Sequence, residues 1–133
     1  MKEVQSTCPY CGSGCSLILS VENNKVVGVK AAGGNAVNQG KMCSKGHFGM
    51  GFIHNESRLK QPLVRKSGVL VPVSWDEALD CVASRFLEIK KRKGADSIAG
   101  FSSARCTNEE NYLMQKLMRA GIGTNNVDHC ARL

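Results

Sequence analysis

The chain has 133 residues and a formal net charge of +7, with 42% apolar residues but only 5% aromatic residues. This length suits a single domain or two small ones. No run of about 18 apolar residues occurs, so we expect no membrane-spanning helix. The densest positive run, Lys90 to Lys93, is typical of a solvated helix terminus, and no aromatic residues interleave the basic ones, which argues against nucleic-acid binding.

The number and position of the cysteines help to predict the cellular compartment of the protein. Seven cysteines are present, and three of them fall within STCPYCGSGC near the N-terminus. Neither an apolar signal segment nor a twin-arginine motif precedes this stretch, so we expect a cytoplasmic protein. In a reducing compartment, clustered cysteines indicate metal binding or redox work ahead of a disulfide framework.

The first 60 residues predict a small subdomain with antiparallel strands. Alternating apolar residues in SLILSVENNKVVGVKA indicate two strands joined by a polar turn at Glu22 to Asn24. The glycine-rich segment AAGGNAVNQGKMC then predicts an ordered loop that leads to Cys43. Ser44 is the expected N-cap of a short helix in SKGHFGMGFI.

From about residue 61 the pattern predicts strands that alternate with longer helices. Two short strands are expected around Ser67-Gly68, and a capping box at Ser74 and Glu77 begins a helix that Gly94 ends. The apolar face of that helix comprises Ala78, Leu79, Val82, Ala83, Phe86 and Leu87.

The last third continues the alternation. A short strand is expected in DSIAGF, followed by a second capping box at Thr107 and Glu110 that begins a helix stopping near Gly121. Strands alternating with helices predict an α/β layer with parallel strands. A layer begun in this way leaves a sheet edge and an apolar face uncovered, so we expect the chain alone to associate.

Four cysteines share one spacing pattern. Cys8, Cys11, Cys15 and Cys43 read C-x2-C-x3-C-x27-C. Structural zinc usually takes two close pairs of ligands, whereas Cys43 stands alone on a separate loop. Four thiolates on glycine-permissive loops suit a 4Fe-4S cluster, whose sulfurs also accept hydrogen bonds from backbone N–H groups. The spacing therefore favours a cluster, with zinc and disulfides as alternatives.

The other candidate residues have plainer interpretations. Cys81 flanks the apolar face of the first long helix and is expected to be a small buried residue. Cys106 precedes a helix N-cap, where packing is favoured over a reactive thiol. No pattern assigns a role to Cys130. Lys45 is either a solvated lysine or a cation beside the cluster, and the three histidines are expected to be hydrogen-bonded loop residues.

Five sequence blocks carry a resemblance to a known family. CPYCGSGC, GKMCSKG, PVSWDEAL, SSARCTNEENYLMQK and GTNNVDHCARL occur in an order that resembles the N-terminal part of formate dehydrogenase catalytic subunits. These subunits belong to the molybdopterin oxidoreductase family, which is related to dimethyl sulfoxide reductase. The resemblance implies an α+β fold class. Residues 1–60 would form a small antiparallel 4Fe-4S-binding subdomain, and residues 61–133 would begin an α/β pterin-binding domain.

The resemblance also implies roles for individual residues. The cluster ligands would be Cys8, Cys11, Cys15 and Cys43, and Lys45 would lie between cluster and pterin on the electron route. The turn from Ser102 to Arg105 would lie near a bis-molybdopterin guanine dinucleotide that carries molybdenum or tungsten, because a helix N-terminus there favours anions. The implied cofactor-binding residues are Ser103, Arg105, Asn108 and Cys130.

The implied activity is oxidation of formate to carbon dioxide, or the reverse, with electrons passing to a ferredoxin-like, nicotinamide-linked or hydrogenase partner. In the family, the CAR segment leads to the metal-binding selenocysteine or cysteine, which would follow Leu133. We therefore expect the chain alone to be inactive, and we hypothesise that the next codon is UGA for selenocysteine. Alternatives are a stand-alone iron-sulfur electron carrier, a zinc-stabilised interaction module, and a molybdopterin oxidoreductase acting on nitrate or another oxyanion.

Overall fold

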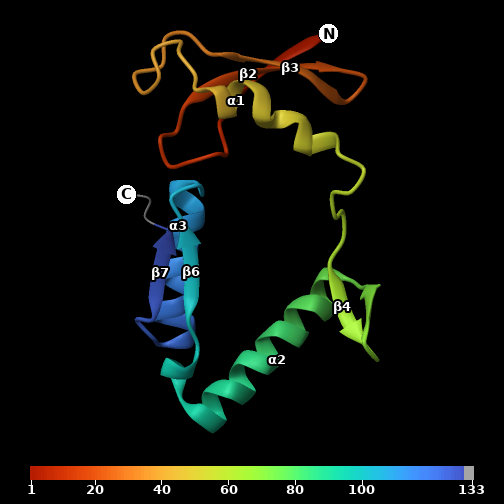
Figure 1. The fold of residues 1–133 in the computed structure, drawn as a ribbon, viewed down its shortest axis with the longest axis vertical. Helices are drawn as coiled ribbons and strands as arrows, with labels where there is room; N and C mark the ends of the chain where they lie inside the picture. The colour runs from red at the N-terminus through yellow and green to blue at the C-terminus, as the bar shows by residue number, and fades with distance from the viewer. Residues whose placement is uncertain (131–133) are drawn as a thin grey trace. The chain divides into compact units, whose positions relative to one another are not determined.

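A computed structural model of the chain describes residues 1–130, which divide into two compact units (Figure 1). The first unit comprises Met1–Arg58, Ser102–Tyr112 and the residues from His129 onward. The second unit comprises Leu59–Phe101 and Leu113–Asp128. The predicted division into residues 1–60 and 61–133 remains a prediction.

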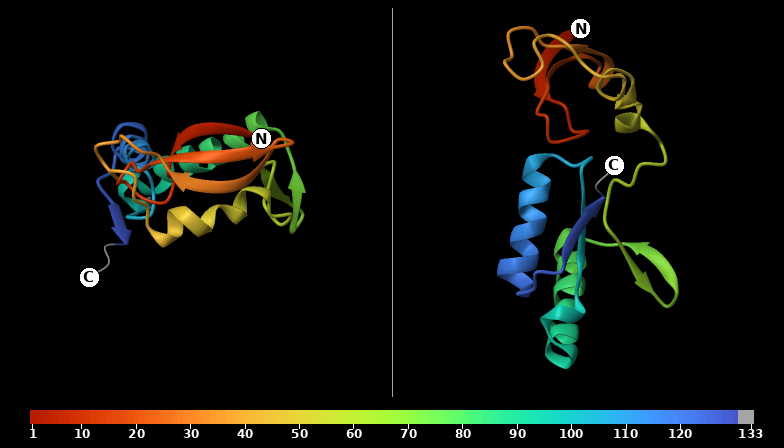
Figure 2. Two further views of the ribbon diagram at one scale, coloured as in Figure 1. Left: turned by 90° about the horizontal axis from the view of Figure 1, so that it is seen from above. Right: turned by 60° about the vertical axis from the view of Figure 1, so that its left-hand side comes forward.

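A three-stranded antiparallel sheet opens the first unit, as the left panel of Figure 2 shows. Its strands are β1 (Lys2–Thr7), β2 (Ser16–Glu22) and β3 (Lys25–Ala31), in the order β1-β2-β3. The predicted hairpin is confirmed: Asn23 and Asn24 form its turn with φ values of 48° and 60°, a conformation that asparagine tolerates. Strand β1 was not predicted, because its six residues are all exposed and give no alternating burial pattern.

Two helical turns pack along β3. They are α1 (Ser44–Phe48) and the 3-10 turn η1 (Gly49–His54). The N-cap of α1 is Cys43 rather than the predicted Ser44, and it makes no side-chain capping bond. The buried core of the unit is formed by Cys8, Leu17 and Met50. A cysteine of the first sequence block therefore lies inside this core.

The second unit begins with a hairpin and a long helix, both as predicted. Strands β4 (Leu63–Lys66) and β5 (Val69–Pro72) pair antiparallel around Ser67 and Gly68. Helix α2 (Trp75–Lys93) begins where the Ser74 hydroxyl accepts a 3.2 Å hydrogen bond from the Glu77 N–H. It ends at Gly94, whose φ of 85° favours glycine.

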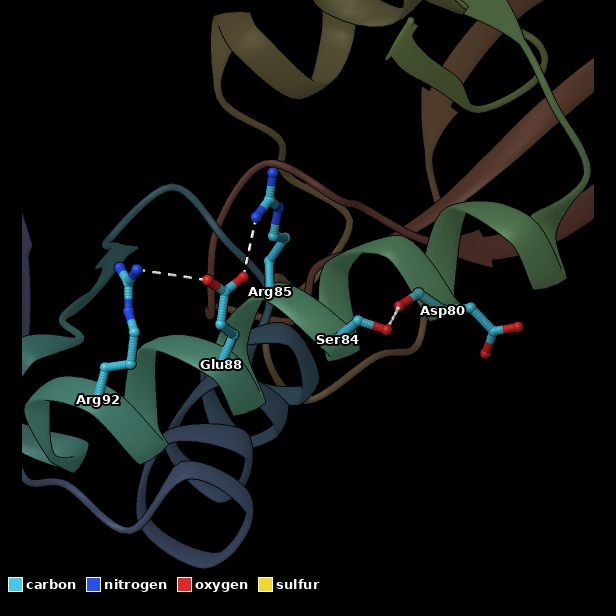
Figure 3. A network of polar contacts seen from close by, with 5 residues as sticks. All are labelled: Asp80, Ser84, Arg85, Glu88 and Arg92. Atoms are coloured by element: carbon cyan, nitrogen blue, oxygen red, sulfur yellow. Dashed lines mark hydrogen bonds and ion pairs between the residues drawn. The ribbon is translucent and has the colours of Figure 1, made fainter.

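Most of α2 is exposed, and only Ala78 and Ile89 are half-buried. Glu88 pairs with Arg85 at 2.9 Å and with Arg92 at 3.5 Å, which are exposed i,i+3 and i,i+4 contacts (Figure 3). No residue of α2 is buried, and Cys81 is exposed, so the prediction that Cys81 is a small buried residue was wrong. Apolar periodicity predicts which face can be buried, but it does not supply the element that covers that face.

The last elements form a strand–helix–strand connection. Strand β6 (Gly100–Ser103) leads to α3 (Asn108–Lys116), the π-helical turn η3 (Leu117–Ile122) and β7 (Val127–Cys130). Strands β6 and β7 pair, and both views draw their arrows in the same direction (Figures 1 and 2). The predicted parallel layer was not found in the expected form: β4 and β5 pair only with each other, and β6 pairs with β7, which was not foreseen. Strand β6 also starts later than expected, after the turn η2 (Ala95–Ser97).

The second capping box is reciprocal, as predicted. The Glu110 N–H donates to the Thr107 hydroxyl at 3.2 Å, and the Thr107 N–H donates to the Glu110 carboxylate at 2.7 Å. The core of the second unit is formed by Ile98, Met118 and Ile122. The chain thus combines helices with an antiparallel sheet and a short parallel pair. No helix within residues 1–130 is long and apolar enough to cross a membrane.

Candidate functional site

The first cysteine loop connects β1 to β2. It is closed at its base by a 2.8 Å hydrogen bond from the Cys8 N–H to the Cys15 carbonyl. Cys8 is buried, whereas Cys11 and Cys15 are half-buried. The Tyr10 hydroxyl donates to the carbonyl of Gly49 at 2.6 Å, which ties the loop to η1. The loop is therefore held at its base and at a second point within it.

The second loop runs from Ala32 to Cys43 and is fastened to the first by Asn38. This buried side chain accepts a 3.1 Å hydrogen bond from the Ser16 N–H and donates to the Ser16 carbonyl at 3.0 Å. It also donates to the Lys41 carbonyl at 2.8 Å. Sequence reasoning missed Asn38, because a single asparagine in a glycine-rich loop carries no periodic signal.

The two loops share a pocket of about 460 Å³. Its lining residues are Ser13, Cys15, Val37, Asn38, Lys41, Met42 and Cys43. Gly46 lies nearby in α1, where an added Cβ would come within 3.3 Å of the Cys8 sulfur and 2.9 Å of Met42 Cγ. The absence of a side chain at Gly46 lets the helix approach the first cysteine loop closely.

The pKa of Cys15 depends on the other three cysteines of the spacing pattern. Burial raises the pKa of Cys15, and repulsion from Cys8, Cys11 and Cys43 raises this pKa further. Cys15 and Cys43 line one pocket, and Cys8 and Cys11 lie on the same β1–β2 loop as Cys15. The structure therefore gathers the four cysteines of the spacing pattern where the two loops meet.

Hydrogen bonds stabilise two of these sulfurs as thiolates. The hydroxyl and backbone N–H of Ser13 lower the pKa of Cys11, and the positive charge of Lys45 lowers it further. The N–H groups of Gly46 and Lys45 lower the pKa of Cys43, with a smaller contribution from the Lys45 charge. Lys45 itself is exposed, so its ammonium lies beside the thiols without being buried among them.

The four cysteines supply a donor set of the kind an iron-sulfur cluster takes. Tetrahedral zinc would need its sulfurs about 2.3 Å from a common point. A 4Fe-4S cluster takes four thiolates on separate corners. All seven cysteines are free thiols in the structure.

A second group of predicted site residues meets at the turn after β6. Ser103 Oγ lies 3.1 Å from Cys130 Sγ and accepts a 3.0 Å hydrogen bond from the Arg105 N–H. The Ser103 hydroxyl, the Ala104 N–H and the Arg105 charge, in decreasing order, lower the pKa of Cys130. The turn therefore favours the thiolate form of Cys130, and the predicted cofactor contacts of these residues remain predictions.

Two further predicted site features are Asn108 and the CAR segment. The side chain of Asn108 is engaged with the first cysteine loop, where its amide donates to the Gly12 carbonyl at 2.8 Å. Its predicted contact with a pterin therefore remains a prediction. Of the CAR segment, only Cys130 is among the described residues, and Ala131, Arg132 and Leu133 lie outside them. Among the histidines, His54 accepts a 2.8 Å hydrogen bond from the Val26 N–H as expected, but it lies at the end of η1 and not in a loop.

The fold and the cysteine site agree with comparisons to known proteins. Residues 1–55 match the molybdopterin oxidoreductase Fe4S4 domain, and residues 58–133 match the molybdopterin oxidoreductase family. The chain belongs to the molybdopterin oxidoreductase family and begins with that family's Fe4S4 domain.

Its similar relatives are formate dehydrogenases. Formate dehydrogenase H of Escherichia coli is 51% identical over 140 residues, covering 100% of this chain and 19% of the relative. A formate dehydrogenase alpha subunit of Methanococcus maripaludis is 47% identical, covering 98% and 19%. A putative formate dehydrogenase of Staphylococcus aureus is 44% identical, covering 99% and 13%. The chain thus spans at most a fifth of the length of these relatives.

Proposed function

We propose that the chain is the N-terminal, cluster-bearing part of a formate dehydrogenase that interconverts formate and carbon dioxide. The observation that carries the proposal is the set of four neighbouring thiols on two loops that Asn38 fastens together. The similarity of the whole chain to formate dehydrogenases, at 44–51% identity, supports formate as the substrate.

In this proposal Cys8, Cys11, Cys15 and Cys43 bind a 4Fe-4S cluster. When bound, the cluster accepts and releases one electron at a time. The chain's own residues hold it in place: Tyr10 ties the first loop to η1, and Asn38 ties the second loop to the start of β2. These fixed loops keep the four sulfurs in a constant geometry.

Lys45 serves as a fixed positive charge on the electron route. Its ammonium lies close enough to Cys11 and Cys43 to lower the pKa of both thiols. The same charge stabilises the additional electron on a reduced cluster, since a nearby cation favours the more negative state. In the family that this sequence resembles, the lysine at the position of Lys45 lies between the cluster and the pterin.

Residues 61–133 form the beginning of an α/β pterin-binding domain in this proposal. The turn with Ser103, Arg105 and Cys130 would contact a bis-molybdopterin guanine dinucleotide, with Asn108 at the start of the following helix. Support comes from the geometry of the turn, which precedes the N-terminus of α3 and stabilises a thiolate at Cys130. The pterin's molybdenum or tungsten would supply the two-electron chemistry.

The proposed partner is an electron-transfer protein of the ferredoxin-like, nicotinamide-linked or hydrogenase type. We place the protein in the cytoplasm, because seven free thiols fit a reducing compartment. A one-electron cluster beside a two-electron site needs an acceptor that receives electrons singly or through further clusters.

Formate-driven reduction of the cluster tests the proposal. The complete gene product, purified without oxygen, is mixed with formate, and the reduced cluster is followed by EPR. We expect a reduced-cluster signal with formate that nitrate does not abolish. A cluster that formate leaves oxidised would contradict the proposal, and a reduced cluster that nitrate re-oxidises would identify an oxyanion reductase instead.

A further inference from the structure

Asn108 and Gly12 make a contact across 96 positions of the chain. The Asn108 amide Nδ2 donates to the Gly12 carbonyl oxygen at 2.8 Å. Gly12 follows Cys11 in the first cysteine loop, whereas Asn108 is the first residue of α3. Both belong to the first unit of the structure. The start of α3 is therefore bonded directly to the backbone of the cysteine loop.

The contact also depends on the glycine. A Cβ added at Gly12 would collide with the Asn108 side-chain oxygen, with its Cγ at 3.2 Å. The Asn108 amide thus lies flat against the backbone at Gly12, where any larger residue would displace it. This close fit limits how the peptide that follows Gly12 can rotate.

That peptide unit has two ends with different partners. The Gly12 carbonyl and the Ser13 N–H belong to one planar trans peptide, so they point in opposite directions. Asn108 holds the carbonyl on one side. On the other side, Ser13 lies beside Cys11, with its hydroxyl oxygen 3.3 Å from the Cys11 sulfur. Fixing the Gly12 carbonyl therefore fixes the orientation of this peptide, and with it the position of Ser13 beside the Cys11 sulfur.

We propose that Asn108 is a positioning residue that orients the Gly12–Ser13 peptide and so sets the reduction potential of a cluster bound at Cys11. A hydrogen-bond donor beside a cluster thiolate stabilises the reduced state, which carries one more negative charge, and raises the potential. The proposal rests on the proposed role of Cys11 as a cluster ligand. It assigns Asn108 a role distinct from a pterin contact.

The test is a redox titration of the anaerobically reconstituted chain, followed by EPR. Replacing the donor by N108A, or by the similarly shaped N108D, frees the peptide to rotate away from Cys11. We expect the equilibrium constant for cluster reduction to fall by roughly tenfold, which is a shift of about 59 mV to lower potential for one electron. Iron content should stay unchanged.

Two further variants separate positioning from general damage. Asn111 lies one turn later in α3, and its amide donates to the Ser103 carbonyl at 3.1 Å, so N111A is the matched control and should leave the potential unchanged. The substitution G12A should displace Asn108 and reproduce the shift. The double variant G12A/N108A should show no larger shift than N108A, because both changes break one contact.

The outcomes distinguish the two proposals. A wild-type chain that assembles no cluster contradicts the proposed function. A wild-type cluster whose potential is the same in N108A and N108D overturns the role of Asn108 and leaves the cysteine ligands standing. Loss of iron in both variants also overturns it, since Asn108 would then hold the loop together without tuning the cluster.

Discussion

Asn38 and Ser16 exchange a reciprocal pair of hydrogen bonds inside the first unit. The Asn38 amide oxygen accepts from the Ser16 N–H at 3.1 Å, and its nitrogen donates to the Ser16 carbonyl at 3.0 Å. Both residues are buried. Ser16 directly follows Cys15, and Asn38 precedes Cys43 in the second loop. One side chain thus joins the two loops that carry the cysteines.

We expect Asn38→Ala to lower the free energy of unfolding of the chain by about 3 kcal/mol, because it leaves buried backbone groups at Ser16 without partners. The same change should reduce iron uptake, since the loop carrying Cys43 loses its attachment. Urea unfolding and iron analysis measure the two effects. As control, Asn35→Ala removes only an exposed bond to the Val37 N–H, and should cost less than about 1 kcal/mol. Equal losses in both variants would count against a special role for Asn38.

The Ser103–Cys130 contact predicts a pH dependence. Because the Ser103 hydroxyl contributes most to lowering the pKa of Cys130, Ser103→Ala should raise that pKa. Alkylation requires the thiolate, so the pH profile for alkylation of Cys130 should move to higher pH. Site-resolved mass spectrometry measures the rate. The exposed Cys81 in the same sample controls for the reagent, and an unchanged Cys130 profile would refute the contact.

Lys45 predicts an effect of charge on the cluster. Replacing it by glutamine removes a cation near Cys11 and Cys43, which should lower the reduction potential of the bound cluster. EPR-monitored titration of the reconstituted chain measures the shift. Lys30→Gln is the matched control, because Lys30 makes an exposed ion pair with Glu3 at 2.7 Å. A shift of equal size in both variants would show that only net charge matters.

Features set by neighbouring residues could be predicted from the sequence. Both capping boxes, at Ser74 and Thr107, form the expected hydrogen bonds. The β2–β3 hairpin forms because Asn23 and Asn24 tolerate positive φ. These elements depend on interactions across three or four residues, which a sequence pattern records directly.

Features set by distant contacts could not be predicted in the same way. The bond from Asn108 to Gly12 joins residues 96 positions apart, and the Asn38 contacts with Ser16 span 22 positions. Neither asparagine belongs to a periodic pattern. The resemblance implied a cofactor contact for Asn108 but not its bond to Gly12, and nothing in the sequence singled out Asn38. The exposure of Cys81 was missed for a related reason, because burial depends on which element packs against α2.

The most direct test of the account is iron and sulfide analysis of the chain after anaerobic reconstitution, with the visible spectrum and EPR of the reduced sample. We expect about four irons and four sulfides per chain. The Cys43→Ala chain should lose this complement, whereas Cys81→Ala should retain it, because Cys81 lies on α2 and outside the proposed ligand set. One zinc per chain without visible absorbance, or a Cys43→Ala chain that keeps its full iron content, would contradict the four-cysteine cluster site.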